Sequence, residues 1–430
     1  MVYMPHWPIP HVKNNIMLGL DRVSELLTRL GNPQNKLPPV IHVSGTNGKG
    51  STIAYLKTIF EKAGYRVHRY VSPHIMRFNE RIMLAGIEIS DPQLYEFIEE
   101  TRLAAEGLHM TFFEATTACA LLAFSKVPAD VLLLEVGMGG RLDATNVIDS
   151  PLLSIITSIS YDHMEYLGDT IAKITSEKAG IIKPGHPCVS SWQMVDAMEV
   201  ITNHCLKANS ELFACGKDWN FEVNEEGFIY HDYKTELNLQ LQKPSLIGLH
   251  QIINASTVVA ACTRYLNKSF NISLDHIKHG LTSTTWPARM QKITAGILYE
   301  MLPEGFELWV DGAHNTGGAQ MISATIANLW KDKPTYLING RTGDRDIKGY
   351  LEYFKGIVEF VYGVRVVSEP KGETAENIVA GAKDAGLTAY ACDSIKDAIR
   401  VILSNAKQPS RILVTGSLYL AADIQLANSN

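Results

Sequence analysis

The hydrophobic pattern near the start of the chain predicts a strand, a tight turn and a helix in immediate succession. Residues 40–43 form a short apolar run, which is typical of a buried strand. A glycine-rich turn follows, and beyond it apolar residues recur at helical spacing up to Gly64, a suitable helix end. The apolar face of this expected helix consists of Ile53, Leu56, Ile59, Phe60 and Ala63.

Further along the chain, short apolar runs keep alternating with longer amphipathic stretches. This alternation predicts an α/β fold with a mostly parallel, doubly wound sheet. Residues 212–241 differ, because their short alternating segments predict a small antiparallel addition. The expected strands of this part cover 66–71, 130–136 and 152–158, and the expected helices cover 16–30, 116–124, 251–265 and a stretch that starts at 91.

A second series of strands and helices begins after Thr285–Arg289. With 430 residues, the chain is long enough for two or three domains, each with its own core. We therefore expect one domain over residues 1–289 and a smaller one over residues 290–430. The expected strands of the second series cover 308–310, 335–338, 360–364 and 411–415, and its expected helices include 317–330 and 374–385.

Polar residues follow the expected strands of the first series at their carboxyl ends. They are the glycine-rich turn after residue 43, Ser72, Glu135 and the pair Asp162–His163. In open α/β sheets, ligands bind beyond the carboxyl ends of the strands. We therefore expect these residues to line one site.

The glycine-rich turn Ser44–Thr52 carries the groups of a phosphate-binding loop. Backbone N–H groups and the start of the following helix attract an anion, Lys49 adds a positive charge, and Ser51 offers a hydroxyl to Mg²⁺. Val43 and Gly50 stand where the usual P-loop pattern has Gly and Ser or Thr. An ordinary tight turn is the alternative, but the strand before it and the helix after it favour phosphate binding.

Two residues at the expected site are candidate metal ligands. Glu135 interrupts an apolar strand, where burial of an isolated carboxylate is costly. Mg²⁺ prefers hard oxygen ligands and phosphates, so we expect Glu135 to bind it, with satisfaction by backbone N–H groups as the alternative. Spacing alone does not favour His163, because imidazole is an unusual Mg²⁺ ligand and a hydrogen-bonded structural histidine is commoner.

Three other residues remain ambiguous on their sequence context alone. Asp311 follows an expected strand, where a carboxylate either binds ribose hydroxyls or caps a helix. Arg289 lies at the expected domain joint, where it either reaches phosphates or stays on the surface. Lys178 has the context of an ordinary solvated lysine.

Composition narrows the class of protein. Hydrophobic residues make up 46% and charged residues 20%, as in ordinary globular proteins. A net charge of −6 without a basic run argues against a nucleic-acid partner. The six scattered cysteines favour reduced thiols, and no apolar stretch approaches the length of about 18 residues that a membrane span needs. Met1–Pro10 lacks the pattern of a signal peptide, so we expect a cytoplasmic protein without a membrane partner, and a monomer.

The order and content of these motifs resemble the folylpolyglutamate synthase/dihydrofolate synthase family of the Mur ligase superfamily. The resemblance covers nearly the whole chain. It implies an N-terminal P-loop ATPase domain, a smaller C-terminal Rossmann-like domain and an active site between them. The motifs that carry it are Ser44–Thr52, Ser72–Pro73, Arg77–Arg81, Glu135–Asn146, Asp162–His163, Glu177–Ile182, Trp286–Arg289, Asp311–Asn315 and Val414–Leu418.

The resemblance also implies roles for individual residues. It identifies Lys49, His163 and Lys178 as catalytic, with Lys178 carbamylated and so converted into a carboxylate-like partner of the metal. The implied Mg²⁺ ligands are Ser51, Ser72, Glu135 and His163. The implied ATP contacts are Thr46, Asn47, Gly48, Lys49, Gly50, Ser51, Asn254, Arg289, Asp311 and His314. The implied acceptor-side residues are Arg81, Thr111, Phe112, Phe113, Glu114, Leu142, Asp143 and Ala144.

The implied activity is ATP-dependent addition of L-glutamate to dihydropteroate and to reduced folates through an acyl phosphate, with Mg²⁺ as cofactor. Thr111–Glu114 matches the dihydropteroate pocket and favours a bifunctional enzyme, although Met17 stands where bifunctional members often have Asp. A folylpolyglutamate synthase alone is one alternative. A cell-wall Mur ligase is disfavoured, because only 44 residues precede Gly45, too few for a UDP-binding domain. A nucleotide-binding switch is the non-ligase alternative, and it would hydrolyse ATP without an acceptor.

Overall fold

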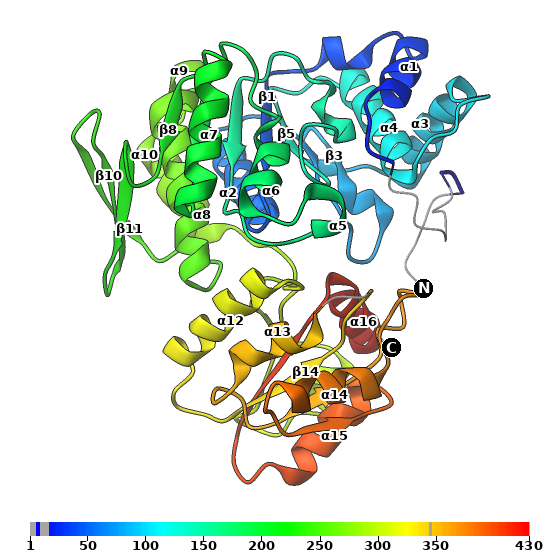
Figure 1. Cartoon of the computed structure of the whole chain (residues 1–430), viewed down its shortest axis with the longest axis vertical. Coiled ribbons are helices and arrows are strands. Elements are labelled where there is room, and N and C mark those ends of the chain that lie inside the picture. The colour runs from blue at the N-terminus through cyan, green and yellow to red at the C-terminus, as the bar shows by residue number, and fades with distance from the viewer. Residues whose placement is uncertain (1–5, 9–16, 344–345, 430) are drawn as a thin grey trace. The chain divides into compact units, whose positions relative to one another are not determined.

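The computed structural model describes residues 6–8, 17–343 and 346–429. Within these ranges the chain forms two compact units (Figure 1). The larger unit extends to Ser245 and resumes over His250–Thr285. The smaller unit comprises Leu246–Leu249 and Trp286–Asn430. The expected domain division at residue 289 stays a prediction.

The larger unit is built on an eight-stranded, mostly parallel sheet. Its strands are β1 (Val40–Ser44), β2 (Val67–Tyr70), β3 (Ile82–Leu84), β4 (Ile87–Glu88), β5 (Val131–Glu135), β6 (Leu153–Ile156), β7 (Cys188–Ser190) and β8 (Leu212–Ala214). They lie in the order β4-β3-β2-β5-β1-β6-β7-β8. The β2–β3 and β3–β4 pairs are antiparallel, and the other pairs are parallel. β1, β5 and β6 are buried along their whole length, which is typical of parallel strands covered on both faces.

Ten α-helices of the described residues belong to this part of the chain. They are α1 (Asp21–Arg29), α2 (Lys49–Lys62), α3 (Asp91–Ala104), α4 (Phe112–Lys126), α5 (Met164–Leu167), α6 (Ile171–Ala179), α7 (Val195–Lys207), α8 (Leu249–Ala261), α9 (Asn267–Ser269) and α10 (Leu274–Ser283). The helix that was expected from residue 16 begins at Asp21, and Ile16 lies outside the described residues. α4 begins earlier than expected because a capping box at Thr111 starts it. A π-helical turn, Cys262–Leu266, continues α8.

The small antiparallel sheet begins later than the sequence pattern predicted. Residues 212–214 are mostly buried and form β8, which pairs in parallel with β7 and so belongs to the main sheet. The alternating pattern acts only from Trp219 onwards, and it is clearest in β10 and β11, where buried and more exposed residues alternate. The three antiparallel strands are β9 (Trp219–Val223), β10 (Gly227–Asp232) and β11 (Leu237–Gln242).

The smaller unit contains a six-stranded sheet. Its strands are β12 (Gln291–Ile293), β13 (Glu307–Val310), β14 (Thr335–Asn339), β15 (Val361–Gly363), β16 (Ala389–Ala391) and β17 (Arg411–Thr415). They lie in the order β12-β13-β17-β14-β15-β16, with only β12 antiparallel. Its helices are α11 (Ile297–Glu300), α12 (Thr316–Leu329), α13 (Ile347–Leu351), α14 (Ala375–Asp384), α15 (Ile395–Asn405) and α16 (Leu418–Ser429). The sequence pattern missed β12 and β16, which are short edge strands with exposed positions.

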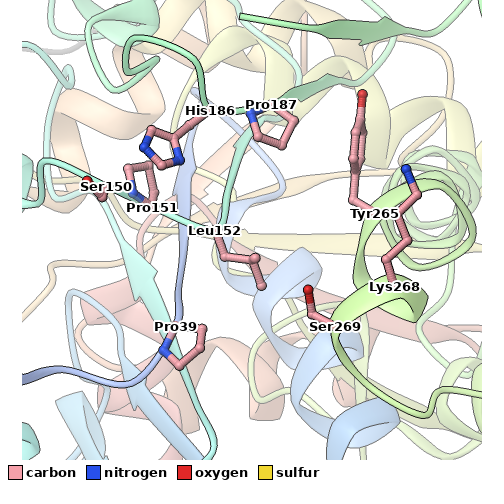
Figure 2. A pocket seen from close by; sticks show the side chains of 9 residues that line it. All are labelled: Pro39, Ser150, Pro151, Leu152, His186, Pro187, Tyr265, Lys268 and Ser269. Atoms are coloured by element: carbon pink, nitrogen blue, oxygen red, sulfur yellow. The ribbon is translucent and has the colours of Figure 1, made fainter.

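A cavity of about 480 Å³ lies where the strands of the larger sheet begin (Figure 2). Pro39, Leu152 and Pro187 line it, and each directly precedes a strand, β1, β6 or β7 respectively. The remaining lining comes from Ser150, Pro151, His186, Tyr265, Lys268 and Ser269. This edge of the sheet is therefore opposite to the one at which the sequence predicts a site.

All six cysteines are free, and all but Cys392 are buried. Within the described ranges, none of the helices combines the length and the apolar character that crossing a membrane requires.

Candidate active site

The turn between β1 and α2 has the backbone geometry of an anion cradle. Gly48 has φ +94°, and no side chain caps the start of α2, so its first N–H groups point to the turn. A Cβ atom on Gly45 would lie 1.9 Å from Oγ1 of Thr157, and one on Gly48 would lie 2.3 Å from Oδ1 of Asn254. Both glycines are therefore required by close packing as well as by the turn.

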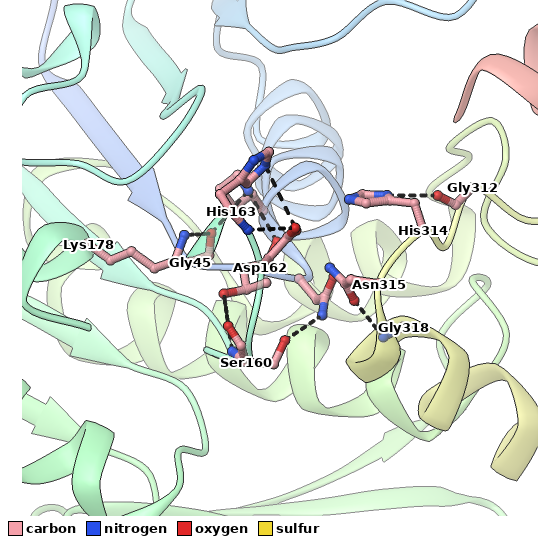
Figure 3. A network of polar contacts seen from close by, with 12 residues as sticks. Gly45, Ser160, Asp162, His163, Lys178, Gly312, His314, Asn315 and Gly318 are labelled. Carbon is pink, nitrogen blue, oxygen red and sulfur yellow. Dashed lines mark hydrogen bonds and ion pairs between the residues drawn. The ribbon is translucent and has the colours of Figure 1, made fainter. Parts of the chain in front are cut away.

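Two lysines converge on this turn from different elements, and Figure 3 shows one of them, Lys178, against Gly45. Nζ of Lys49 donates to the carbonyl oxygens of Gly45 and Thr46 at 3.1 and 3.2 Å. Nζ of Lys178, near the end of α6, donates to the same Gly45 oxygen at 3.0 Å. Lys178 is only 4% exposed, and burial together with the charge of Lys49 lowers its pKa to about 7. The solvated-lysine interpretation of Lys178 is therefore wrong.

The segment after β6 contacts the other side of the glycine-rich turn Ser44–Thr52, which we call the phosphate turn after its predicted role. Backbone N–H groups of Thr46 and Asn47 donate to the Ser158 carbonyl at 3.0 and 3.2 Å. The Asn47 side chain donates to Oγ of Ser160 at 3.2 Å. In the same segment, the His163 ring lies 3.9 Å from an Asp162 carboxylate oxygen, and His163 has φ +50° (Figure 3).

Oxygen atoms that could bind a metal ion lie near the ends of the neighbouring strands. Glu135, the last residue of β5, is 5% exposed, and its carboxylate accepts from the Ser72 N–H at 3.2 Å. Ser51, in the first turn of α2, accepts a hydrogen bond from Gln251 at 3.2 Å. A carboxylate and two serine hydroxyls are hard oxygen ligands, so this donor set fits Mg²⁺. In the described part of the chain, no three His, Cys, Asp or Glu side chains form a metal-binding group.

Asn254 and Gln251 approach the turn from α8. Nδ2 of Asn254 donates to Oε1 of Gln251 at 3.1 Å, and both side chains are buried. Sequence reasoning predicted Asn254 and missed Gln251. The available signal was a pair of amides three residues apart on a helix that is otherwise apolar.

Of the residues that we expect on the acceptor side, Thr111 and Glu114 cap the start of α4 itself. The Thr111 side chain accepts from the Glu114 N–H, and the Glu114 carboxylate accepts from the N–H and hydroxyl of Thr111, both at 2.8 Å. Arg22 of α1 adds a two-point ion pair to Glu114, at 2.7 and 3.2 Å. Glu114 thus fixes the start of α4 and joins it to α1, a partner that the sequence did not identify.

Arg81 lies between aromatic rings at this start of α4. Its guanidinium carbon is 5.5 Å from the centroid of Phe78 and 5.4 Å from that of Phe112. Nε of Arg81 donates to Nδ1 of His74 at 2.8 Å. Burial and the Arg81 charge lower the pKa of His74 to about 3, so this imidazole is a neutral acceptor. Sequence analysis predicted Arg81 and Phe112 but not His74.

The loop after β5 faces the start of α4 and ends in a short helical turn, Ala144–Val147. A Cβ on Gly137 would lie 2.4 Å from the Phe113 ring, so this loop packs directly on Phe113. Leu142 is half-buried, whereas Asp143 and Ala144 are buried. Arg141 fixes the loop to α6 through an ion pair with Glu177 at 2.8 Å.

The smaller unit presents its own polar loop after β13. Asp311 is 3% exposed and accepts from the N–H groups of Met290 and Ala313, both at 2.8 Å. Burial raises the pKa of Asp311, and the Arg289 guanidinium opposes this shift. Nδ1 of His314 lies 3.1 Å from the Gly312 carbonyl (Figure 3). Asn315, not Asp311, caps α12, so the helix-capping interpretation of Asp311 is wrong.

Family models assign both parts of the chain to one class of enzyme. Residues 43–262 match the Mur ligase middle domain. Residues 289–418 match the Mur ligase glutamate ligase domain. A phosphate turn in the first match and a second α/β unit in the other agree with this class.

Individual relatives narrow the class to a family. The chain is 33% identical to dihydrofolate synthase/folylpolyglutamate synthase of Bacillus subtilis, over 97% of either chain. It superposes with a TM-score of 0.86 on Escherichia coli FolC in complex with DHPP and ADP, at 31% identity over 97% of this chain and 94% of that one. The Yersinia pestis enzyme solved with Mn and AMPPNP gives a TM-score of 0.84 at 28% identity, over 97% of this chain and 95% of that one.

The chain belongs to the dihydrofolate synthase/folylpolyglutamate synthase family, and it is an ATP-dependent ligase. The predicted family, the α/β fold class and the ligation of glutamate to folates are confirmed. The roles predicted for individual site residues stay predictions.

Proposed function

We propose that this ligase adds L-glutamate both to dihydropteroate and to reduced folates. The observation that carries the proposal is the convergence of Lys49 and Lys178 on Gly45 beside the uncapped start of α2. This arrangement supports binding of the ATP phosphates. At the start of α4, the Arg81 guanidinium lies over the Phe112 ring. This combination of a cation and an aromatic ring supports binding of a flat, polar acceptor next to the ATP phosphates.

The proposed reaction has two steps. The acceptor carboxylate attacks the γ-phosphorus of ATP, which forms an acyl phosphate and releases ADP. The glutamate amine then attacks the acyl carbon, an amide bond forms and phosphate leaves. Lys49, the N–H groups of α2 and Asn254 would hold and orient the phosphates, so that charge is neutralised where it develops.

A divalent metal ion is part of the proposal, with Mg²⁺ as the physiological ion. Two related structures solved with Mn, one of them from Yersinia pestis, support the divalent ion. Ser51, Ser72, Glu135 and His163 would hold it, and it would supply charge neutralisation at the phosphates. We also propose that Arg289, Asp311 and His314 contact ATP.

Lys178 is proposed to be carbamylated. Carbamylation requires the neutral amine, and a buried lysine with its pKa at about 7 supplies that form at neutral pH. The product would carry oxygens instead of an ammonium group next to Lys49, which removes the repulsion between two cations.

The remaining parts of the proposal concern the state of the protein in the cell. We propose a monomer in the cytoplasm that takes small-molecule substrates only. Six free cysteines support a reducing compartment. Sedimentation analysis checks the monomer, and a stable dimer would overturn it.

The decisive test is a coupled assay of ADP release by the full chain. Dihydropteroate and tetrahydrofolate are supplied separately, each with and without L-glutamate. We expect ADP release with either acceptor, and only when glutamate is present. Activity with tetrahydrofolate alone would restrict the enzyme to folylpolyglutamate synthesis, and ATP hydrolysis without any acceptor would overturn the ligase reaction.

A further inference from the structure

A buried hydrogen-bonded chain connects the centre of the larger sheet to the loop after β5. Nε2 of His42, in the middle of β1, lies 2.9 Å from Oγ1 of Thr145. That hydroxyl donates to Oδ1 of Asp143 at 2.6 Å. His42 and Thr145 are fully buried and Asp143 is 4% exposed, so solvent does not compete for these bonds.

The available protons give each bond a direction. Both oxygens of Asp143 face N–H donors, since Oδ1 accepts from Thr145 N–H at 3.0 Å and Oδ2 accepts from Met138 N–H at 2.9 Å. The single Thr145 proton therefore goes to Asp143, and the hydroxyl accepts from His42. Burial lowers the pKa of His42 to about 3, so the neutral ring has one N–H, and it lies on Nε2. Nδ1 has no partner among the described residues.

Asp143, the carboxylate at the end of this chain of bonds, controls the shape of the loop after β5. Asp143 ties the loop at Met138, near its start, and at Thr145, near its end. Between these points lies Leu142, and directly before them lies Gly137, which packs on Phe113. A shift of the Asp143 carboxylate therefore moves the loop surface next to Phe113. The loop also meets the phosphate turn, since the Ser44 hydroxyl donates to the Gly139 carbonyl at 2.8 Å, but β1 and the turn keep their own backbone bonds.

We propose that His42 is a positioning residue for the pteroyl acceptor, which acts through Thr145 on Asp143 and the loop after β5. The proposal rests on the proposed function, because that function places the acceptor against this loop. His42 is fully buried, so it would act on the acceptor only through these bonds. The imidazole lies on a rigid central strand and holds the Asp143 carboxylate through Thr145. This arrangement keeps the loop after β5 in one conformation.

The test compares steady-state constants of full-length variants with those of the wild type. His42→Leu removes the donor, and His42→Gln supplies an amide N–H in its place. Thr145→Val breaks the chain of bonds at its middle. His68→Leu is the matched control, because His68 is a fully buried histidine on β2 whose Nε2 bonds to the Val127 carbonyl, in another part of the sheet.

We expect His42→Leu to raise KM for the pteroyl acceptor about tenfold, the effect of one lost buried hydrogen bond. KM for ATP should stay within about twofold, because the phosphate turn is not part of the chain of bonds. His42→Gln should recover most of the acceptor KM. The double variant His42→Leu/Thr145→Val should match Thr145→Val alone, since both changes remove one connection.

Several outcomes would overturn the proposal. Equal changes in the KM values for ATP and acceptor would indicate general loss of structure, as would the same change in His68→Leu. Additive effects in the double variant would separate His42 from Thr145. Nitrogen NMR of the wild type provides a readout without turnover, and a His42 ring protonated on Nδ1 would contradict the direction of the bonds. Failure of the proposed function differs from all of these, because the wild type itself would then not use either acceptor.

Discussion

The two edges of the eight-stranded sheet differ in how their polar groups are held. At the carboxyl ends, Lys178, Glu135 and Asp143 are buried and hydrogen-bonded, and the partners of Lys178 and Glu135 lie 133 and 63 residues away in the sequence. At the amino ends, the cavity of Figure 2 is lined by three prolines, and its Lys268 is exposed. Burial of charge is costly unless partners are arranged for it. Charged groups are therefore buried, at a cost in free energy, at the carboxyl-end edge, where a site is expected, and the cavity at the amino-end edge avoids this cost.

The largest effect should come from the lysine of the phosphate turn. Lys49→Ala should lower kcat about 10²–10³-fold with ATP saturating, since it removes a cation that faces the transferred phosphate. The ADP-release assay measures this loss. Lys62→Ala, an exposed lysine at the far end of the same helix, is the control. Full activity of Lys49→Ala would place the phosphates elsewhere.

Replacement of Lys178 should lower activity less than replacement of Lys49, and a small molecule should partly reverse the loss. Lys178→Ala should lose activity about 10–100-fold, as is usual for partners of a metal site. Acetate should restore part of it by supplying a carboxylate in the vacated space. Lys173→Ala on the exposed side of α6 is the matched control. Labelled bicarbonate should give a carbamate NMR signal in the wild type that Lys178→Ala lacks; absence of this signal from the active wild type would refute carbamylation.

Glu135 should affect the metal more than the chemistry. Glu135→Gln keeps the shape of the side chain but removes its charge, so the Mg²⁺ concentration for half-maximal activity should rise about tenfold or more. Titration of activity with Mg²⁺ measures this change. Glu88→Gln, on the exposed edge strand β4, should behave like the wild type. An unchanged titration in Glu135→Gln would remove Glu135 from the metal site.

The sequence predicted which residues lie at the carboxyl-end edge because the signals there are local, and the roles of these residues stay predictions. The glycine-rich composition of Gly45–Ser51 by itself predicts a phosphate turn, and Glu135 is the one charged residue in the otherwise apolar strand β5. Of the main-sheet strands, the pattern predicted β1, β2, β5 and β6, of which β1, β5 and β6 are buried on both faces. It missed the short strands β3, β4 and β7, and it assigned the residues of β8 to the antiparallel addition.

Sequence reasoning missed what depends on contacts between distant segments. Arg22 reaches Glu114 across 92 residues, and His42 reaches Thr145 across 103. The burial of Lys178 is of the same kind, because its partner Gly45 is 133 residues away. No local spacing encodes such pairs. The edge strands β12 and β16 were missed because three residues with exposed positions give no periodicity.

The buried Lys178 should also make stability depend on pH. Its pKa is about 7 in the folded chain, whereas an unfolded lysine titrates near pH 10.4, so between these values the unfolded state binds more protons. The free energy of unfolding should therefore rise with pH from about 7 to 10, with this lysine contributing at most about 1.4 kcal/mol per pH unit. Denaturant titrations in buffer free of carbon dioxide measure the slope. Lys178→Met should flatten it, and equal slopes would show that Lys178 is protonated when buried.

The smallest effects should come from the amino-end edge. Lys268 is exposed and its Nζ lies 5.4 Å from the centroid of the Tyr265 ring, so Lys268→Ala removes no buried hydrogen bond. We expect kcat and the KM values for ATP, glutamate and acceptor to stay within about twofold of the wild type. His186→Ala should behave in the same way, since the hydrogen bonds of His186 to Ser210 and Lys183 come from its backbone. These two variants test the comparison itself. A tenfold change in any constant would mean that events at the beginning of β1 and β7 reach the phosphate turn, and the two edges would then have to be treated as one coupled system.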